Sequence, residues 1–197
     1  LMVGRWTGAI PVYKTSAKVR NLLTFGVPLI AYIVVLLVNI IAQKNVSALY
    51  YYVFCILVMV AAFFMTQSKP VATLLLFSLL GIVAMLIGIM TSGIVSIYAF
   101  LSGGLFCSIM WPCIFSLSLA GLGKLETQGA AFLIMMILGG GIIPPIQGKL
   151  ADIIGIHQSY IIAAVCFGYL AFFAFAVKGI LKKQGIDYDA EVSAGGH

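Results

Sequence analysis

The chain has 197 residues, of which 63% are hydrophobic and 8% are charged. Soluble domains carry about 25% charged residues, so this composition excludes an ordinary soluble protein and indicates an integral membrane protein. The formal net charge of +6 does not indicate a nucleic-acid partner, because the basic residues stand singly or in pairs between apolar stretches and form no basic face.

Residues 1–13 have the composition of the end of a truncated span, and since the chain starts inside a hydrophobic sequence we expect a fragment that lacks its N-terminal portion. Six complete transmembrane helices are predicted after it, because each stretch comes near the roughly 20 residues that cross about 30 Å of hydrocarbon. They cover residues 22–42, 50–66, 71–90, 94–119, 129–148 and 159–177. Apolar runs of this length favour helices over barrel strands. The predicted fold is an all-α, multi-span integral membrane bundle over residues 14–177, followed by a polar tail at residues 178–197.

Lysine and arginine positions predict the orientation of these spans. If the connector that holds Lys14 is cytoplasmic, only Lys44 and Lys149 lie on the outer side. The basic residues on the cytoplasmic side are then Lys14, Lys18, Arg20, Lys69, Lys124, Lys178, Lys182 and Lys183. This bias satisfies the positive-inside rule and predicts a cytoplasmic C-terminus.

The acidic residues all lie in the expected connectors or the tail. They are Glu126, Asp152, Asp187, Asp189 and Glu191. A proton-driven transporter normally needs an acid within the membrane, so in such a protein the proton carrier would lie outside this chain. Arg5 is the one charge within an expected span, and it either snorkels to the interface or pairs with an acid from another part of the protein. His157 falls in a connector, where we expect a solvated side chain.

Trp111 and Pro112 interrupt the apolar span at residues 94–119. Cys107 lies four residues before Trp111 and Ser108 three before it, so one helix face offers a thiol, a hydroxyl and an indole. Sugars suit such a surface, because their C–H faces stack on an aromatic ring while their hydroxyls take hydrogen bonds. The alternative is an ordinary packing or interfacial tryptophan. Pro112 favours the cavity, because a bend opens the backbone there.

Residues 139–141 are three consecutive glycines, followed by prolines at 144–145. Close contact with another helix is the main interpretation of the glycines, and a mobile hinge is the alternative. Phe132 and Met136 lie at helical spacing from the first glycine and could line a cavity, although core packing is the more common use of such residues. Gln147 is a lone polar side chain at the outer end of its span.

Neither an enzyme nor a metal site is expected. The four cysteines lie in apolar runs without CxxC spacing or histidine neighbours, which is typical of buried small hydrophobic residues. No GxxxxGK[ST] motif, carboxylate cluster or nucleophile with a nearby base is present in the sequence. No cofactor is therefore predicted.

Three ordered motifs resemble one transporter family. They are GRWTGAIPVYKTSAKV at residues 4–19, SIMWPCIFSLSLAGLG at residues 108–123 and FLIMMILGGGIIPPIQGKLAD at residues 132–152. In this order they resemble the C-terminal half of the fucose/glucose/galactose:proton symporters of the major facilitator superfamily. The resemblance places Arg5 in the eighth helix of that family, residues 108–117 in the tenth and residues 139–152 in the eleventh.

The sequence departs from the family pattern at two positions and in its number of spans. Trp111 stands where the family has tyrosine or phenylalanine, and Cys113 replaces threonine. Three spans separate the eighth and tenth helices, where the family has one. The added pair is either residues 22–42 with residues 50–66, or the two spans that follow the first.

The resemblance implies a secondary active transporter that moves a hexose or deoxyhexose with a proton by alternating access. The implied partners are the sugar, the lipid bilayer and the N-terminal half of the same transporter, and the implied location is the bacterial inner membrane. Arg5 would pair with an acid outside the chain. A transporter of a different small solute and a non-transporting membrane scaffold stay open as alternatives. The expected substrate-facing residues are Trp111, Ser108, Cys107, Phe132 and Met136.

Overall fold

The computed structural model describes residues 17–41, 47–66 and 69–185, and within these ranges it contains helices and no strand. The elements follow in the order α2 (Ala17–Ile41), α3 (Ser47–Met65), α4 (Pro70–Met90), α5 (Ile94–Leu119), η2 (Gly123–Leu125), α6 (Glu126–Met135), η3 (Met136–Leu138), α7 (Gly139–Ile154), η4 (Gln158–Tyr160) and α8 (Ile161–Lys183).

Apart from the turn at Thr66, the described residues of every predicted span are helical, which confirms the all-α membrane fold. Among the described residues, four helical stretches are long and apolar enough to cross a membrane: Pro70–Met90, Ile94–Leu119, Gly123–Ile154 and Gln158–Lys183. The first two predicted spans contain the shorter apolar helices Pro28–Ile41 and Tyr52–Phe63. The protein is therefore a multi-pass membrane protein. The span predicted to end within residues 1–13 lies outside the described residues.

Several helices extend beyond their predicted hydrophobic bounds, because a helix continues past the hydrocarbon into the polar interface. Helix α2 begins at Ala17, so Lys18 and Arg20 lie in its first turn and not in a connector. Glu126 is the first residue of α6, where the positive end of the helix dipole favours an acid. Helix α8 continues to Lys183, so the first part of the predicted tail is helical, with basic residues at the negative end of the dipole.

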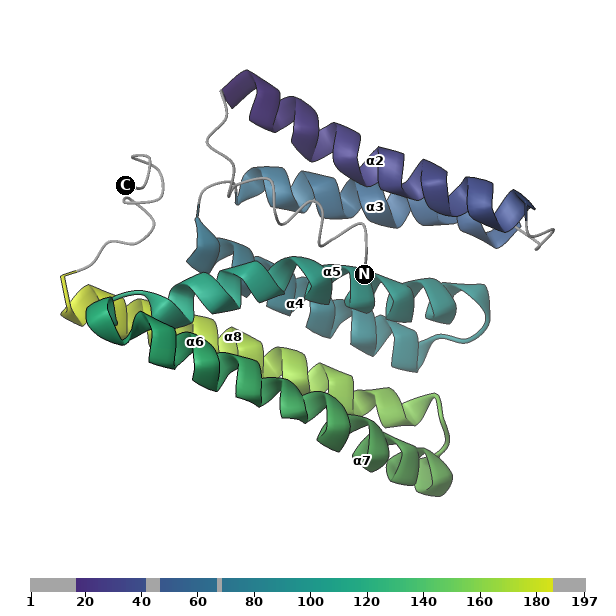
Figure 1. The fold of residues 1–197 in the computed structure, drawn as a ribbon. Coiled ribbons are helices and arrows are strands. Elements are labelled where there is room, and N and C mark those ends of the chain that lie inside the picture. Colours follow the sequence, from purple (N-terminus) through teal and green to yellow (C-terminus); the bar gives the residue numbers. More distant parts are fainter. Residues whose placement is uncertain (1–16, 42–46, 67–68, 186–197) are drawn as a thin grey trace.

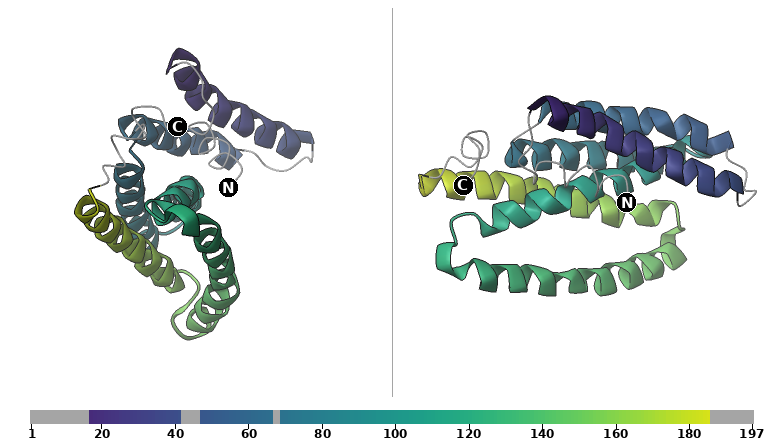
Figure 2. Two further views of the ribbon diagram at one scale, coloured as in Figure 1. Left: turned by 60° about the vertical axis from the view of Figure 1, so that its left-hand side comes forward. Right: turned by 45° about the horizontal axis from the view of Figure 1, so that its top comes forward.

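Helix α4 is central to the arrangement, since its packing against α5 and α8 is the most extensive in the molecule. Figure 1 shows α3 above this group and α2 outside α3. The α6–α7 element overlaps α8 in Figure 1, but Figure 2 shows that the two diverge from the turn that connects α7 to α8. The chain therefore passes from a peripheral hairpin, through a packed centre, to a long outer helix, and α8 then returns to pack on α4.

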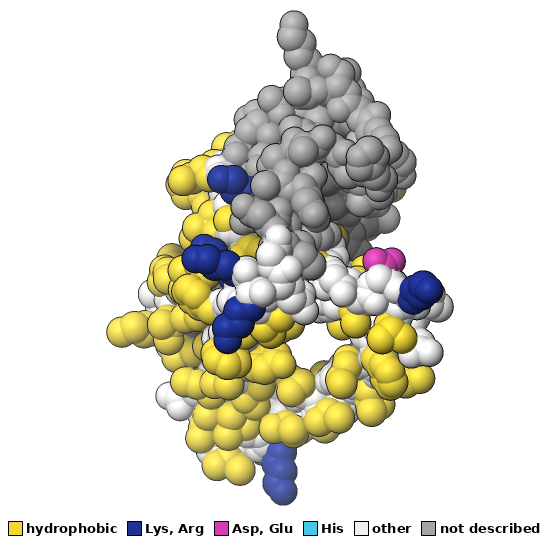
Figure 3. Space-filling view, turned by 90° about the vertical axis from the view of Figure 1, so that its left-hand side faces the viewer, with side chains coloured by type: hydrophobic (Ala, Val, Ile, Leu, Met, Phe, Trp, Pro, Cys, Tyr) yellow, Lys and Arg dark blue, Asp and Glu magenta, His cyan; other side chains and the backbone are white. Residues whose placement is uncertain are grey.

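Tight turns at one end of the bundle connect α4 to α5 and α7 to α8. Gly93 in the first turn has φ 74° and Gly155 in the second has φ 92°, values that glycine adopts without the steric cost borne by other residues. At the opposite end, α4 and α6 begin and α5 and α8 end. Figure 3 faces that end and shows lysine or arginine side chains spaced around it.

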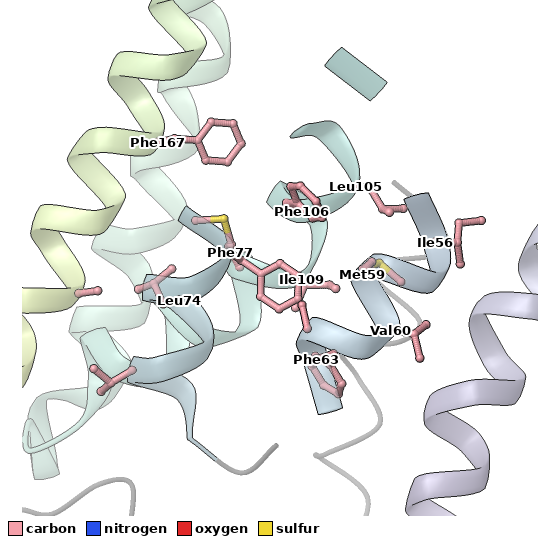
Figure 4. Close-up of a cluster of buried hydrophobic side chains, with 14 of the residues drawn as sticks. Ile56, Met59, Val60, Phe63, Leu74, Phe77, Leu105, Phe106, Ile109 and Phe167 are labelled. Atoms are coloured by element: carbon pink, nitrogen blue, oxygen red, sulfur yellow. The ribbon is translucent and has the colours of Figure 1, made fainter. Parts of the chain in front are cut away.

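The buried core lies where α3, α4 and α5 meet (Figure 4). Met59 of α3, Phe77 of α4 and Ile109 of α5 are all fully buried there. The rings of Phe77 and Phe106 lie 5.7 Å apart at 52°, a tilted geometry that aromatic pairs prefer. Glycine allows α4 to approach α8, because a Cβ on Gly81 would lie 2.5 Å from the ring of Phe167. This core fixes α5 relative to its neighbours.

The α6–α7 element differs from the core helices, because none of the residues in its most hydrophobic window is buried. A 3-10 turn at Met136–Leu138 separates α6 from α7, and the helix then continues through Pro144 and Pro145. A Cβ added at any of the glycines 139–141 would meet nothing within 4 Å. The close helix contact predicted for these glycines is therefore not made by the described part of the chain.

Candidate functional site

Helices α5, α7 and α8 line an open cavity of about 350 Å³. Helix α4 closes its inner side, and the space-filling view shows the molecule hollowed between the outer helix and the packed centre (Figure 3). The volume falls in the range typical of small-molecule sites, roughly 300–1,000 Å³. The lining residues are Met85, Phe100, Gly103, Gly104, Cys107, Ile143, Gln147, Tyr160, Ala163, Cys166, Phe167 and Leu170.

The lining is predominantly apolar and aromatic, with few polar groups. Phe100 and Tyr160 stack with ring centroids 4.1 Å apart and an interplanar angle of 18°. Gln147 contributes an amide, and Cys107 and Cys166 contribute thiols from α5 and α8. Aromatic faces beside one amide can stack on an apolar ligand surface and orient it by hydrogen bonding. None of the lining residues carries a carboxylate.

His157 lies beside the aromatic pair, in the turn between α7 and α8. Its Nε2 is 3.1 Å from the carbonyl oxygen of Ile89, which accepts the hydrogen bond, and its ring meets the edge of Phe100 with centroids 5.5 Å apart. The sequence-based expectation of a solvated histidine was wrong, because the side chain is half-buried and joins two hairpins.

The hydroxyl groups of Thr91 and Ser96 form further hydrogen bonds with carbonyl oxygens at the same end of α4. Thr91 Oγ1 donates to the carbonyl of Ile87 at 2.6 Å, and Ser96 Oγ donates to the carbonyl of Gly88 at 2.8 Å. The backbone N–H of Thr91 also donates to the carbonyl of Ile87, so the Thr91 hydroxyl is a second donor there, whereas Ser96 and His157 supply side-chain donors to the next two carbonyls of the last turn. The end of α4 next to the cavity is thus fixed in place.

The predicted residues of α5 lie on two faces. Cys107 is exposed and lines the cavity. Ser108 is buried, and its hydroxyl donates to the carbonyl of Gly104 at 2.9 Å. Trp111 is 45% exposed and tilts against Phe115 with centroids 6.4 Å apart. The structure therefore brings Cys107 to the cavity and places Ser108 and Trp111 beside it, but not in its lining.

The remaining predicted residues lie farther along the chain. Phe132 of α6 and Met136 of η3 are 66% and 76% exposed and do not line the cavity. Gln147 of α7 does line it. Arg5 lies outside the described residues.

Sequence reasoning missed Phe100, Tyr160 and Cys166. A signal was present in α5, where the cavity residues Phe100, Gly103, Gly104 and Cys107 follow the i, i+3, i+4, i+7 spacing of one helix face. The residues of α8 continue this lining from a distant part of the sequence, so their involvement depends on the packing of α8.

Within residues 17–41, 47–66 and 69–185, no group of three or more His, Cys, Asp or Glu side chains could hold a metal ion.

Comparison with known proteins identifies the relatives of this chain. It is 46% identical over 92 residues to a glucose/galactose transporter of Brucella abortus, a match that covers 47% of the chain and 22% of the relative. The chain belongs to the fucose/glucose/galactose:proton symporter family. Within this symporter family, the L-fucose-proton symporter of Haemophilus influenzae is 33% identical over 60% of the chain and 29% of the relative. The Escherichia coli protein of the same name is 34% identical over 55% of the chain and 25% of the relative.

Each match thus spans less than a third of the length of these curated relatives. No family model and no solved structure matches the chain significantly. The three motifs that predicted this symporter family from the sequence agree with the relatives found.

Proposed function

We propose that the chain is the C-terminal portion of a secondary active transporter that carries a hexose or deoxyhexose together with a proton. The identity of 46% to a protein named glucose/galactose transporter is the observation that carries this proposal. The proton is proposed as the coupling ion because two further relatives are named L-fucose-proton symporter. The N-terminal half of the transporter would complete the pathway, since sites of such proteins lie between two halves.

Substrate contacts are proposed for Cys107, Ser108 and Trp111 of α5, with Phe132 and Met136 as outer contacts. The position of Cys107 in the cavity lining supports this part of the proposal. Trp111 offers a half-exposed aromatic face one helical turn away, on which a sugar could stack. Arg5 is proposed as the electrostatic partner of an acid in the other half, because an unpaired charge in a membrane is costly.

The additional helix pair is proposed to be α2 with α3. Helix α4 packs extensively on both α5 and α8, as a member of the shared bundle should, whereas the main contacts of α2 are with α3. This assigns α4 to the ninth helix of the family, α5 to the tenth and the α6–α7 element to the eleventh.

We further propose that the C-terminus is cytoplasmic. Lys69 precedes α4, Lys124 precedes α6 and Lys182 lies in the last turn of α8, so all three belong to one end of the bundle. Lys149 lies toward the other end, within α7. A basic excess on one side marks the cytoplasmic face.

Uptake by the full-length protein in proteoliposomes tests the proposal. Radiolabelled glucose, galactose and fucose are offered separately with an inward proton gradient, and accumulation of at least one sugar that a protonophore abolishes is the expected result. Accumulation that persists with protonophore would refute proton coupling. No saturable sugar uptake in protein that remains monodisperse would refute the sugar assignment and direct the search to other small solutes.

A further inference from the structure

The inner face of α3 is as deeply buried as the central helices. Ile56, Met59, Val60 and Phe63 follow helical spacing, and each is at most 6% exposed. Figure 4 shows Met59 directed toward Ile109 of α5, whereas Ile56 and Val60 project from the other side of α3. Helix α3 is therefore part of the core that holds α5, although it belongs to the hairpin proposed as additional.

Tyr52 makes a second, polar connection between α3 and α5. Its hydroxyl donates to the carbonyl oxygen of Leu101 at 3.3 Å, and its ring stacks with that of Tyr98 at a centroid distance of 6.5 Å. A tyrosine hydroxyl within hydrocarbon needs a partner, because an unsatisfied polar group is costly there. The bond consequently favours one position of α5 relative to α3.

This connection lies on the cavity-bearing part of α5. Leu101 falls between Phe100 and Gly103, both of which line the cavity. Farther along α5, Pro112 has no N–H to donate to the carbonyl of Ser108, so the helix is more easily bent there. A contact near Leu101 therefore orients the cavity-lining segment of α5, which precedes the more easily bent position at Pro112.

We propose that Tyr52 is a positioning residue, which acts through Leu101 to hold the cavity face of α5 in its binding orientation. The α2–α3 hairpin is then a brace for the substrate helix and not a passive addition. The effect on sugar binding rests on the proposed function, whereas the effect on the position of α5 does not.

The first test measures transport by the full-length protein with Tyr52→Phe, which removes only the hydroxyl. The matched control is Tyr169→Phe on α8, whose side chain is 66% exposed and outside the cavity. Interhelical hydrogen bonds in membranes correspond to a factor of about three on average, so Tyr52→Phe is expected to raise KM up to about threefold with little change in kcat per reconstituted molecule. Equal KM values for Tyr52→Phe, Tyr169→Phe and the unchanged protein would overturn the positioning role in substrate binding.

The second test needs no transport. In full-length protein that retains Cys107 as its single cysteine, the rate of reaction with N-ethylmaleimide reports the exposure of the cavity face of α5. Tyr52→Phe is expected to raise this rate about twofold to threefold, and Tyr169→Phe to leave it unchanged. An unchanged rate in Tyr52→Phe would refute the brace. A raised rate in a protein that transports no sugar would uphold the brace and refute the proposed function.

Discussion

Replacing Gly81 with alanine should destabilise the contact between α4 and α8. A Cβ at this position would lie 2.5 Å from Cδ1 and Cε1 of Phe167 and 2.8 Å from its Cγ. Carbon atoms in contact are normally about 3.5–4.0 Å apart, so the overlap is about 1 Å and involves several ring atoms. The overlapped atoms include Cγ of Phe167, so the clash is avoided only if the whole ring moves.

Overpacking of this kind costs about 1–3 kcal/mol. For a chain of this size, a loss of about 2 kcal/mol lowers Tm by roughly 4–8 °C. The assay is the loss of the monodisperse peak of the full-length protein in detergent, after heating at a fixed rate because unfolding of such proteins is often irreversible.

Gly168→Ala on α8 is the matched control, because a Cβ there would meet nothing within 4 Å and Tm should not fall. The double change Gly81→Ala with Phe167→Leu should recover part of the loss, since the smaller side chain removes the ring atoms that collide. An unchanged Tm for Gly81→Ala, or equal losses for Gly81→Ala and Gly168→Ala, would refute the close approach of these helices.

Two further predictions concern the end of α4 and the substrate helix. His157→Leu leaves the carbonyl of Ile89 without its donor and should lower stability by about 1 kcal/mol, whereas His157→Gln should retain most of it; equal Tm values for both variants would contradict the hydrogen bond. Trp111→Ala should raise the KM for the transported sugar about fivefold to tenfold, with a smaller rise for Trp111→Phe, because it removes the aromatic face; an unchanged KM would exclude stacking on Trp111.

The spans could be predicted because the hydrocarbon thickness requires long apolar runs, and the span at residues 94–119 has the same bounds as α5. The sequence did not allow us to predict which face of each helix is buried. Helix α5 is apolar nearly all round, so its sequence does not distinguish the buried Ser108 from the half-exposed Trp111. In a membrane, both lipid and protein interiors accept apolar residues, and hydropathy loses its directional information.

Long-range polar contacts were equally hidden from sequence reasoning. The bond between His157 and Ile89 joins positions 68 residues apart, and the bond between Tyr52 and Leu101 joins positions 49 apart. A connector histidine and a span tyrosine each have many possible environments, and only the packing of the hairpins selects one. The cavity itself could be predicted only in part, through Cys107, because α8 contributes residues that no local motif marks.

The way α4 ends has a consequence for the order in which the protein assembles during synthesis. Ser96 reaches the carbonyl of Gly88 across only 8 residues, so this bond can form as soon as the turn into α5 has left the ribosome. His157 is made much later, and until then the carbonyl of Ile89 must rely on water or lipid headgroups. The α4–α5 hairpin can therefore insert with the carbonyl of Gly88 already bonded, and the later arrival of the α7–α8 turn supplies the donor for the carbonyl of Ile89.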